Sequence, residues 1–271
     1  MLNKLLFFYT ETPLHAGTGS SVSVVDLPIQ RERATQYPMV QGSGVKGALR
    51  SESGLAEQDL NVVFGPPTAT AKDHAGALAV GDARIVLFPV RSLVGVFAYA
   101  TSLPVINRLA REMRDGREGR DSFKLPNFET TEALTTKQSA LNASGKVVLE
   151  EYSFTAKADA AVDKVAQWLA DNAFPEGEAY NYWRERVKSH LVILPEDAFR
   201  DFTVSGTEIR THVRLDPAKK TVAEGALWTS ESVPSDALFY APVTFRASRK
   251  EKDNRNAEAI AQMTMETVSA R

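Results

Sequence analysis

The alternation of hydrophobic and polar positions predicts a chain of mixed strands and helices. Runs rich in branched and aromatic residues, typical of β-strands, occupy residues 5–14, 77–89, 93–100, 146–155, 191–194 and 237–245. Apolar positions spaced three and four apart predict helices at residues 103–113 and 158–170. The strands and helices follow no regular βαβ rhythm, so the pattern favours an α+β fold over a doubly wound one.

Three further segments have patterns of their own. Residues 211–215 and 221–228 flank the turn DPAKK and predict a long hairpin, whose alternation suggests that one face is not packed on a core. The tail from residue 246 is charged and then rich in Ala and Met, which is compatible with a helix or a mobile end. Residues 111–121 carry Arg at every third position, a spacing that drifts around a helix, and we interpret them as a solvated charged loop.

Composition narrows the classes of protein that remain. The chain has 271 residues, of which 43% are hydrophobic, so it can bury a sizeable core as one large domain or two small ones. Its formal net charge is −2, so any surface for RNA must come from local clustering of Lys and Arg. The absence of cysteine excludes disulfides, thiolate zinc sites and cysteine nucleophiles. No apolar run approaches the roughly 20 residues that span a bilayer, and we expect a soluble, cytoplasmic protein with no membrane partner.

The glycine-rich stretch GSGVKGALR, residues 42–50, suggests a phosphate-binding helix start. It is no nucleotide-binding P-loop, because Lys46 precedes a glycine and no Ser or Thr follows. Ser43 is a candidate helix cap, and Lys46 and Arg50 lie four residues apart. Exposed N–H groups at such a start, with both cations, are suited to a phosphodiester. The alternative is a helix that merely begins at Ser43.

Three other residues are candidates for chemistry. His15, in the loop HAGTGSS, is either a general acid or base or a structural side chain. Asp26 lies in an apolar run that leads directly to Arg31 and Arg33. One carboxylate can bind a divalent ion through its waters, orient a hydroxyl or act as a base, but it cannot form a two-metal site alone. Trp228 is either a platform for a nucleobase or a core residue. The four histidines contain no H-x-x-x-H pair, so a histidine metal site is not supported.

The order of these motifs resembles the RAMP superfamily. HAGTGSSVSVVDLPIQRE followed by YPMVQGSGVKGALR is similar to the N-terminal signature of the backbone subunit of type III-B (Cmr) CRISPR effector complexes. The resemblance is dense over residues 5–52 and returns at residues 210–234, which look like that family's thumb. It implies a modified ferredoxin-like, RRM-like palm with inserted fingers. A single RAMP domain would then span residues 1–271, with a β-hairpin thumb at about residues 210–234.

The resemblance also implies a function. In this family several copies stack head to tail along a CRISPR RNA, together with other Cmr subunits. Each thumb displaces a base pair of the duplex between the guide and the single-stranded target RNA, and the target is cut at regular intervals. Asp26 matches the loop aspartate needed for cleavage with a divalent metal, Mg²⁺ or Mn²⁺, and His15 falls at the family's loop histidine.

Further positions carry over from the family's motifs. Ser43, Lys46 and Arg50 match the S-x-x-K-G-x-x-R helix that contacts the guide backbone. Trp228 and Glu231 match the W-x-x-E pattern of the thumb, where Glu231 is expected to support the active site.

Arg31 and Arg33 are expected to hold phosphates or the adjoining subunit. The chain departs from the family in one respect, because no glycine follows Gly225 and the usual C-terminal glycine-rich loop is missing.

Two other functions stay open at this point. One is a scaffold that binds guide RNA without cutting, against which the presence of Asp26 argues. The other is a RAMP ribonuclease that processes guide RNA without metal, with catalysis by His15. Subunit stoichiometry separates this processing enzyme from the first two, because backbone subunits form filaments on RNA.

Overall fold

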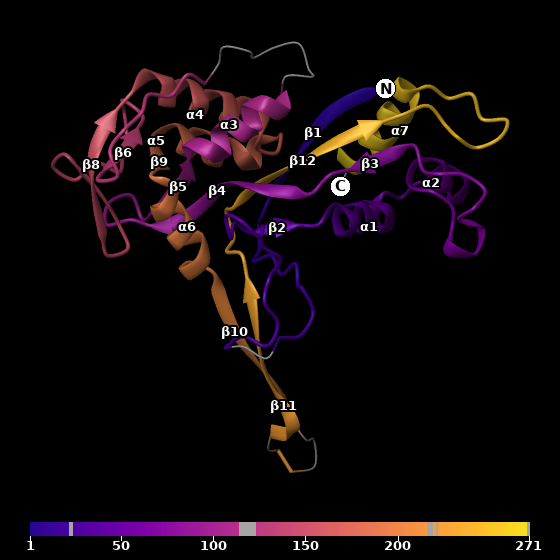
Figure 1. The fold of residues 1–271 in the computed structure, drawn as a ribbon, viewed down its shortest axis with the longest axis horizontal. Coiled ribbons are helices and arrows are strands. Elements are labelled where there is room, and N and C mark those ends of the chain that lie inside the picture. The colour runs from indigo at the N-terminus through magenta and orange to yellow at the C-terminus, as the bar shows by residue number, and fades with distance from the viewer. Residues whose placement is uncertain (22–23, 114–122, 216–218, 221, 270–271) are drawn as a thin grey trace.

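The computed structural model describes residues 1–21, 24–113, 123–215, 219–220 and 222–269. Most of the strands in this part of the chain form one mixed sheet, in the order β1-β12-β4-β5-β9-β6-β8-β7, with β2 on β4 and β3 on β12 (Figure 1). Its strands are β1 (Leu2–Tyr9), β2 (Met39–Val40), β3 (Leu78–Val80), β4 (Ala83–Arg91), β5 (Phe97–Ser102), β6 (Glu132–Thr135), β7 (Lys146–Leu149), β8 (Tyr152–Ala158), β9 (Leu191–Leu194) and β12 (Leu238–Phe245).

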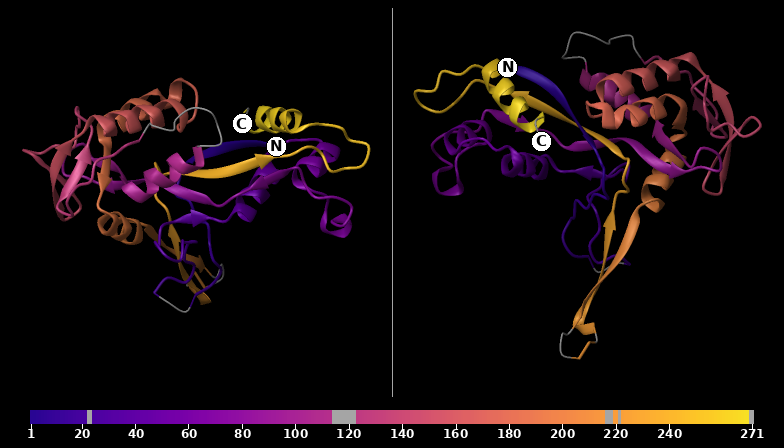
Figure 2. Two further views of the ribbon diagram at one scale, coloured as in Figure 1. Left: turned by 45° about the horizontal axis from the view of Figure 1, so that its top comes forward. Right: turned by 180° about the vertical axis from the view of Figure 1, so that it is seen from behind.

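Helices cover both faces of this sheet. They are α1 (Gly42–Glu52), α2 (Glu57–Phe64), α3 (Leu103–Glu112), α4 (Ala160–Asn172), α5 (Asn181–His190), α6 (Glu196–Ser205) and α7 (Ala257–Ser269). Helices α3, α4 and α5 lie together over the half that contains β5, β6 and β9, and α1 and α2 lie on the opposite side of β12 from α7 (Figures 1 and 2). The α+β class predicted from the sequence is confirmed. No helix in the described ranges is long and apolar enough to cross a membrane.

Apolar clusters lie on both faces of the sheet. Successive side chains of a strand point to opposite sides, so one strand can contribute to two clusters. In β9, Val192 and Leu194 join a cluster that contains Phe199 of α6. Leu191 and Ile193 of the same strand join a second cluster, built with α3, α4 and α5. A third cluster packs α2 and α7 against the end of β12. All four residues of β9 are apolar because this strand lies between two hydrophobic clusters, one on each face of the sheet.

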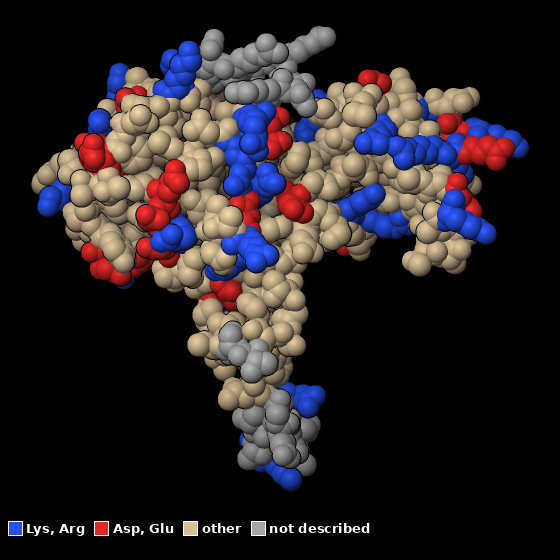
Figure 3. Space-filling view, viewed as in Figure 1, with Lys and Arg blue, Asp and Glu red and all other residues tan. Residues whose placement is uncertain are grey.

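A separate hairpin of β10 (Glu208–Leu215) and β11 (Val222–Ser232) projects from this body (Figure 1). We call it the thumb. Its apolar side chains Ile209, Val213, Leu215 and Leu227 are all at least half exposed. The prediction that one face of this hairpin is not packed on a core is confirmed. In the space-filling view the thumb is a narrow stalk with Lys and Arg near its tip (Figure 3).

Several predicted strands have different bounds. The strand predicted at residues 5–14 is β1, which ends at Tyr9 because its pairing with β12 ends there. The strand predicted at residues 146–155 is a hairpin of β7 and β8, which reverses at Glu150 with a φ of 48°. Residues 77–89 form β3 and β4, separated at Gly81, whose N–H donates to a carbonyl oxygen of β12. In each case long-range pairing decides where a β-rich run is divided.

The predicted helices are closer to the observed ones. Residues 103–113 form α3, and residues 158–170 correspond to α4, which begins later because the Asp159 side chain accepts the Ala161 N–H as its cap. The Ala- and Met-rich tail is a helix, α7. Most of the charged segment predicted as a loop, residues 114–121, lies outside the described residues. Helices α2, α5 and α6 were not predicted.

Candidate functional site

The outer edge of β11 binds the two loops that carry the candidate catalytic residues. Leu14 and Val233 exchange two backbone hydrogen bonds of 2.8 Å. The N–H of Leu27 donates to the carbonyl oxygen of Thr229 (3.1 Å), and the N–H of Glu231 donates to the carbonyl oxygen of Leu27 (3.0 Å). The loop after β1 and the loop around residue 26 are therefore attached side by side to the base of the thumb.

Asp26 is held by Thr229 through both its backbone and its side chain. Its Oδ2 accepts from the Thr229 N–H (2.8 Å) and from the Thr229 hydroxyl (2.9 Å), and its own N–H donates to that hydroxyl oxygen (3.1 Å). The residue is exposed. The backbone and hydroxyl donors of Thr229 favour the charged form, so the pKa of Asp26 lies below its ordinary value. Asp26 is therefore an exposed anion at neutral pH.

Glu231 lies beneath this loop as a buried anion. Its carboxylate accepts from Arg31 (2.5 Å), from the Ile29 N–H (3.0 Å) and from the Thr207 hydroxyl (2.9 Å). Burial by itself raises the pKa of Glu231, but the Ile29 N–H and the Arg31 guanidinium outweigh it, and the net shift is downward. Glu231 therefore fixes the segment after Asp26 to the thumb, and its support of an active site stays a prediction.

Arg31 and Arg33 have different surroundings. Besides Glu231, Arg31 donates to the carbonyl oxygens of Gln36 (2.8 Å) and Thr203 (3.0 Å), so its guanidinium is committed within the chain. Arg33 is exposed. Of the two, Arg33 is the one whose position suits a phosphate or an adjoining subunit, and both contacts stay predictions.

His15 is bound to the same strand. Its Nδ1 lies 2.6 Å from the carbonyl oxygen of Glu231, and because a carbonyl only accepts, Nδ1 carries the proton. A Cβ at Gly17 would lie 2.7 Å from Nε2, so a side chain there would displace the His15 ring. The structure thus brings His15 and Asp26 onto positions of β11 that are two residues apart.

Trp228 lies on the thumb and not in a core. Its ring stacks on that of His212, with 5.4 Å between centroids and an interplanar angle of 15°. It is partly exposed and belongs to none of the three buried clusters. The interpretation of Trp228 as a core residue is therefore wrong. Further along the thumb, Arg214, Lys219 and Lys220 are exposed near the tip.

The second group of predicted residues lies away from the thumb, at the start of α1. Ser43 and Lys46 line a pocket of about 380 Å³ together with Arg246 and Arg249, from the segment that follows β12. Both arginines are exposed. Burial, and to a smaller extent repulsion from Arg50, lower the pKa of Lys46. The pocket combines three cationic side chains with a helix start.

The prediction that Ser43 caps this helix is wrong. The N-cap is Gln41, without a side-chain hydrogen bond, and Asp82 accepts the Gly42 N–H at 2.8 Å. A carboxylate from the turn between β3 and β4 thus replaces the local cap. Arg50 donates to the carbonyl oxygen of Gly65 (2.5 Å) and to Asn61 (3.0 Å), linking α1 to α2, and its contact with a guide stays a prediction.

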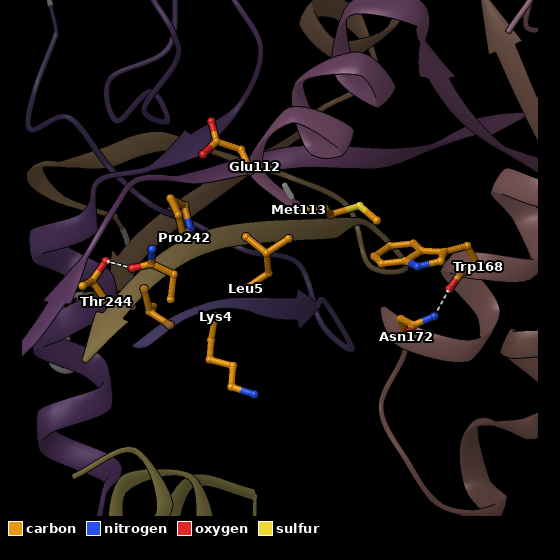
Figure 4. Close-up of a pocket in the computed structure, with 10 residues that line it drawn as sticks. Lys4, Leu5, Glu112, Met113, Trp168, Asn172, Pro242 and Thr244 are labelled. Carbon is orange, nitrogen blue, oxygen red and sulfur yellow. Dashed lines mark hydrogen bonds between the residues drawn. The ribbon is translucent and has the colours of Figure 1, made fainter. Parts of the chain in front are cut away.

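A larger cavity, of about 470 Å³, is lined by none of the predicted residues. Its walls come from β1, β12, the end of α3 and α4, with Lys4, Glu112 and Trp168 around it (Figure 4). It contains no constellation of nucleophile and base, and we assign it no chemistry.

A divalent cation has one candidate ligand at the thumb site. Across the described part of the chain, no three His, Cys, Asp or Glu side chains are placed to hold a metal ion together. Asp26 fits a Mg²⁺ that keeps most of its waters, because this ion commonly takes one or two carboxylates plus phosphate oxygens. The remaining ligands would then come from RNA and water.

Comparison with known proteins identifies the family. The model of the RAMP superfamily matches residues 7–265. The chain belongs to the RAMP superfamily. This RAMP protein is 38% identical over 255 residues to the CRISPR system Cmr endoribonuclease Cmr4 of Pyrococcus furiosus, with 92% of this chain and 83% of the relative covered. It is 26% identical to the CMR subunit Cmr4 of Saccharolobus solfataricus, over 91% of this chain and 85% of the relative.

A solved structure agrees with these relatives. The crystal structure of oligomeric Cmr4 from Pyrococcus furiosus matches this RAMP protein with a TM-score of 0.72 and 30% identity, over 99% of this chain and 88% of that one. The superfamily membership inferred from the motifs is therefore confirmed.

Four residues of these sites were not found from the sequence: Thr229, Asp82, Arg246 and Arg249. The two arginines are part of the charged run RASRKEK, so their composition was a signal, but only the structure brings them to α1. The partners of Thr229 and Asp82 are far away in the sequence, Asp26 for one and the Gly42 N–H for the other, and no local pattern marks them.

Proposed function

We propose that this RAMP protein is the backbone subunit of a type III-B (Cmr) effector complex, which binds CRISPR RNA and cleaves complementary target RNA. The observation that carries the proposal is the exposed, anionic Asp26 fixed at the base of a projecting thumb. The Pyrococcus furiosus relative, named a Cmr endoribonuclease, supports the reaction class. The crystal structure of oligomeric Cmr4 supports an assembly of several copies. We propose that these copies form a filament with other Cmr subunits in the cytoplasm.

Guide RNA binds along the body of the subunit. The pocket of Lys46, Arg246 and Arg249 offers three cationic side chains, which suit a phosphodiester. The Gly42 N–H at the start of α1 is bound by Asp82, so the side chains and not this N–H supply the contact. The net charge of the chain is −2, so the affinity for RNA comes from this local group and from the cationic thumb tip.

Target RNA meets the thumb. A hairpin that displaces one base pair lets the 2′-oxygen of a target nucleotide align with the adjacent phosphorus, a geometry that an A-form helix does not allow. Trp228, partly exposed and stacked on His212, is suited to receive a base beside the displaced pair. The thumb thereby places the distorted target nucleotide, with its 2′-oxygen in line with the adjacent phosphorus, next to Asp26.

Cleavage is a transesterification. The 2′-hydroxyl gives up its proton to water, the 2′-oxygen attacks phosphorus and the bond from phosphorus to the 5′-oxygen breaks. The leaving 5′-oxygen takes up a proton, and the products are a 2′,3′-cyclic phosphate and a 5′-hydroxyl. With its lowered pKa, Asp26 is a weak base, so its role is to orient the 2′-hydroxyl and a hydrated cation. Because Nδ1 of His15 donates to the carbonyl oxygen of Glu231, Nε2 is the ring nitrogen left to exchange a proton with a reacting oxygen. When bound by Asp26, Mg²⁺ or Mn²⁺ supplies positive charge that offsets the charge developing on the phosphate.

The test is a reconstitution with guide and end-labelled target. The complex is expected to yield a ladder of regularly spaced products from complementary RNA and none from a scrambled sequence. A target with a single 2′-deoxy substitution is expected to lose one product and keep the others. A complex that binds the target without cutting it would show a scaffold. Cutting of free guide precursor by a single copy in EDTA would show a processing enzyme.

A further inference from the structure

We propose that Thr229 is a positioning residue, which holds the carboxylate of Asp26 in the orientation needed for cleavage. The inference rests on the proposed function of the Asp26 site. Between Trp228 and Glu231, the two residues of the thumb pattern, the chain reads Thr229 and Ser230. Thr229 is the one that contacts Asp26 directly.

The hydrogen bonds between the two residues form a closed unit. The Thr229 hydroxyl accepts from the Asp26 N–H (3.1 Å) and donates to Asp26 Oδ2 (2.9 Å), so its donor and one acceptor position serve a single residue. The Thr229 N–H adds a second donor to the same Oδ2, at 2.8 Å. Both the backbone and the side chain of Asp26 are thereby fixed relative to β11.

This arrangement matters because Asp26 is exposed. An exposed carboxylate otherwise samples several rotamers, and ordering it has an entropic cost at the moment of reaction. Both hydrogen bonds from Thr229 go to Oδ2, so Oδ1 is the oxygen that these bonds leave to face RNA or a hydrated cation. The single acid of the site thus has a defined direction before RNA arrives.

The contact also joins two elements that must act together. Asp26 and Leu27 are bound to β11, the same strand that carries Trp228. If the base of the thumb shifts when RNA binds, the Asp26 carboxylate moves with it, because the carboxylate is hydrogen-bonded directly to Thr229 of β11. We infer that thumb insertion and placement of the acid are one event.

The test compares Thr229→Val, which keeps the shape and the N–H but removes the hydroxyl, with Thr229→Ser, which keeps the hydroxyl. Thr155→Val is the matched control, because Thr155 is an exposed threonine in β8. Three quantities are measured for each assembled complex: the single-turnover cleavage rate, the Kd for target RNA and the hydrogen exchange of residues 24–30.

Thr229→Val is expected to lower the cleavage rate by about 10- to 100-fold, the range for losing a bond to a charged group or misplacing a reacting group. The Kd for target RNA is expected to stay within about twofold, because binding is spread over many contacts. Exchange of residues 24–30 is expected to rise, since the Asp26 N–H loses its acceptor. Thr229→Ser and Thr155→Val are expected to behave as wild type in all three measurements.

Two results would overturn the inference. The first is a Thr229→Val complex that cuts at the wild-type rate although its exchange has risen. The second is a Thr229→Ser complex as slow as Thr229→Val, which would make packing of the methyl group the cause. If the wild-type complex itself binds target without cutting, the proposed function fails instead, and the exchange of the Val and Ser variants still decides whether the hydroxyl holds Asp26.

Discussion

The ion pair between Glu231 and Arg31 gives a quantitative prediction for stability. The two side chains are 9% and 15% exposed, and Glu231 also accepts from Ile29 and Thr207. Removing one partner of a buried pair costs about 3–5 kcal/mol, because the other charge is left without compensation. Arg31 keeps two carbonyl partners, so Glu231→Ala belongs at the lower end, at about 3 kcal/mol.

The assay is urea and thermal unfolding of the isolated chain. A loss of about 3 kcal/mol corresponds to a fall in Tm of about 6–12 °C for a chain of this size. Arg200→Ala is the control, because its pair with Asp201 is about half exposed and such pairs contribute about 0–1 kcal/mol. The double variant Arg31→Ala/Glu231→Ala is expected to cost at least about 1.5 kcal/mol less than the sum of the single changes.

The same pair predicts a dependence on pH. The pKa of Glu231 in the folded chain lies below its ordinary value of 4.5. Its contribution to stability is therefore fully present above about pH 4.5 and is lost as the pH falls through the lower, folded pKa. The difference in unfolding free energy between wild type and Glu231→Gln is expected to narrow below pH 4.5. Additive single changes, or a Glu231→Ala cost no larger than that of Arg200→Ala, would refute this reasoning.

Three other changes have defined outcomes. Gly42→Ala is expected to destabilise the chain by about 1–3 kcal/mol in urea unfolding, because the new Cβ would lie 2.5 Å from a carbonyl oxygen. Gly47→Ala in the same helix is expected to stabilise the chain by about 0.5–1 kcal/mol, because its Cβ meets nothing within 4 Å. Lys46→Gln and Arg246→Gln are each expected to lose one phosphate contact. Each change should then reduce, by about 0.7, the slope of the logarithm of the guide-RNA binding constant against the logarithm of the salt concentration. Unchanged slopes would contradict the assignment of this pocket to guide RNA. Trp228→Ala is expected to weaken target binding by about 1–3 kcal/mol while Trp228→Phe retains most of it, and equal affinities in a filter-binding assay would exclude base stacking.

The sequence predicted the elements that local patterns determine. Helix α4 shows its apolar spacing and its Asp159 cap, and β9 is a short run of apolar residues bounded by a proline. The hairpin was recognisable from its turn and alternation. The predicted strand bounds were wrong where pairing with a distant strand sets the end of an element. One example is the break between β3 and β4 at Gly81, whose N–H donates to a carbonyl oxygen of β12.

The site was predicted in its residue types but not in its connections. His15, Asp26 and Glu231 were found through motifs. The attachment of His15 and Asp26 to the strand that carries Glu231 is a tertiary arrangement over about two hundred residues of sequence. Asp26 could be found because it matches the loop aspartate of the RAMP motif, whereas a lone acid in an apolar run is by itself a weak signal. Thr229 could not, because a threonine in a strand is ordinary and its partner is distant.

In the proposed function, Asp26 enables metal-dependent cleavage of target RNA. The measurement that tests it most directly is the single-turnover cleavage of end-labelled target by the assembled complex, comparing wild type with Asp26→Asn, each in Mg²⁺ and in EDTA. We expect regularly spaced products from wild type in Mg²⁺ only, with target binding unchanged in the variant. An Asp26→Asn complex that cuts at the wild-type rate would contradict it, as would undiminished wild-type cleavage in EDTA.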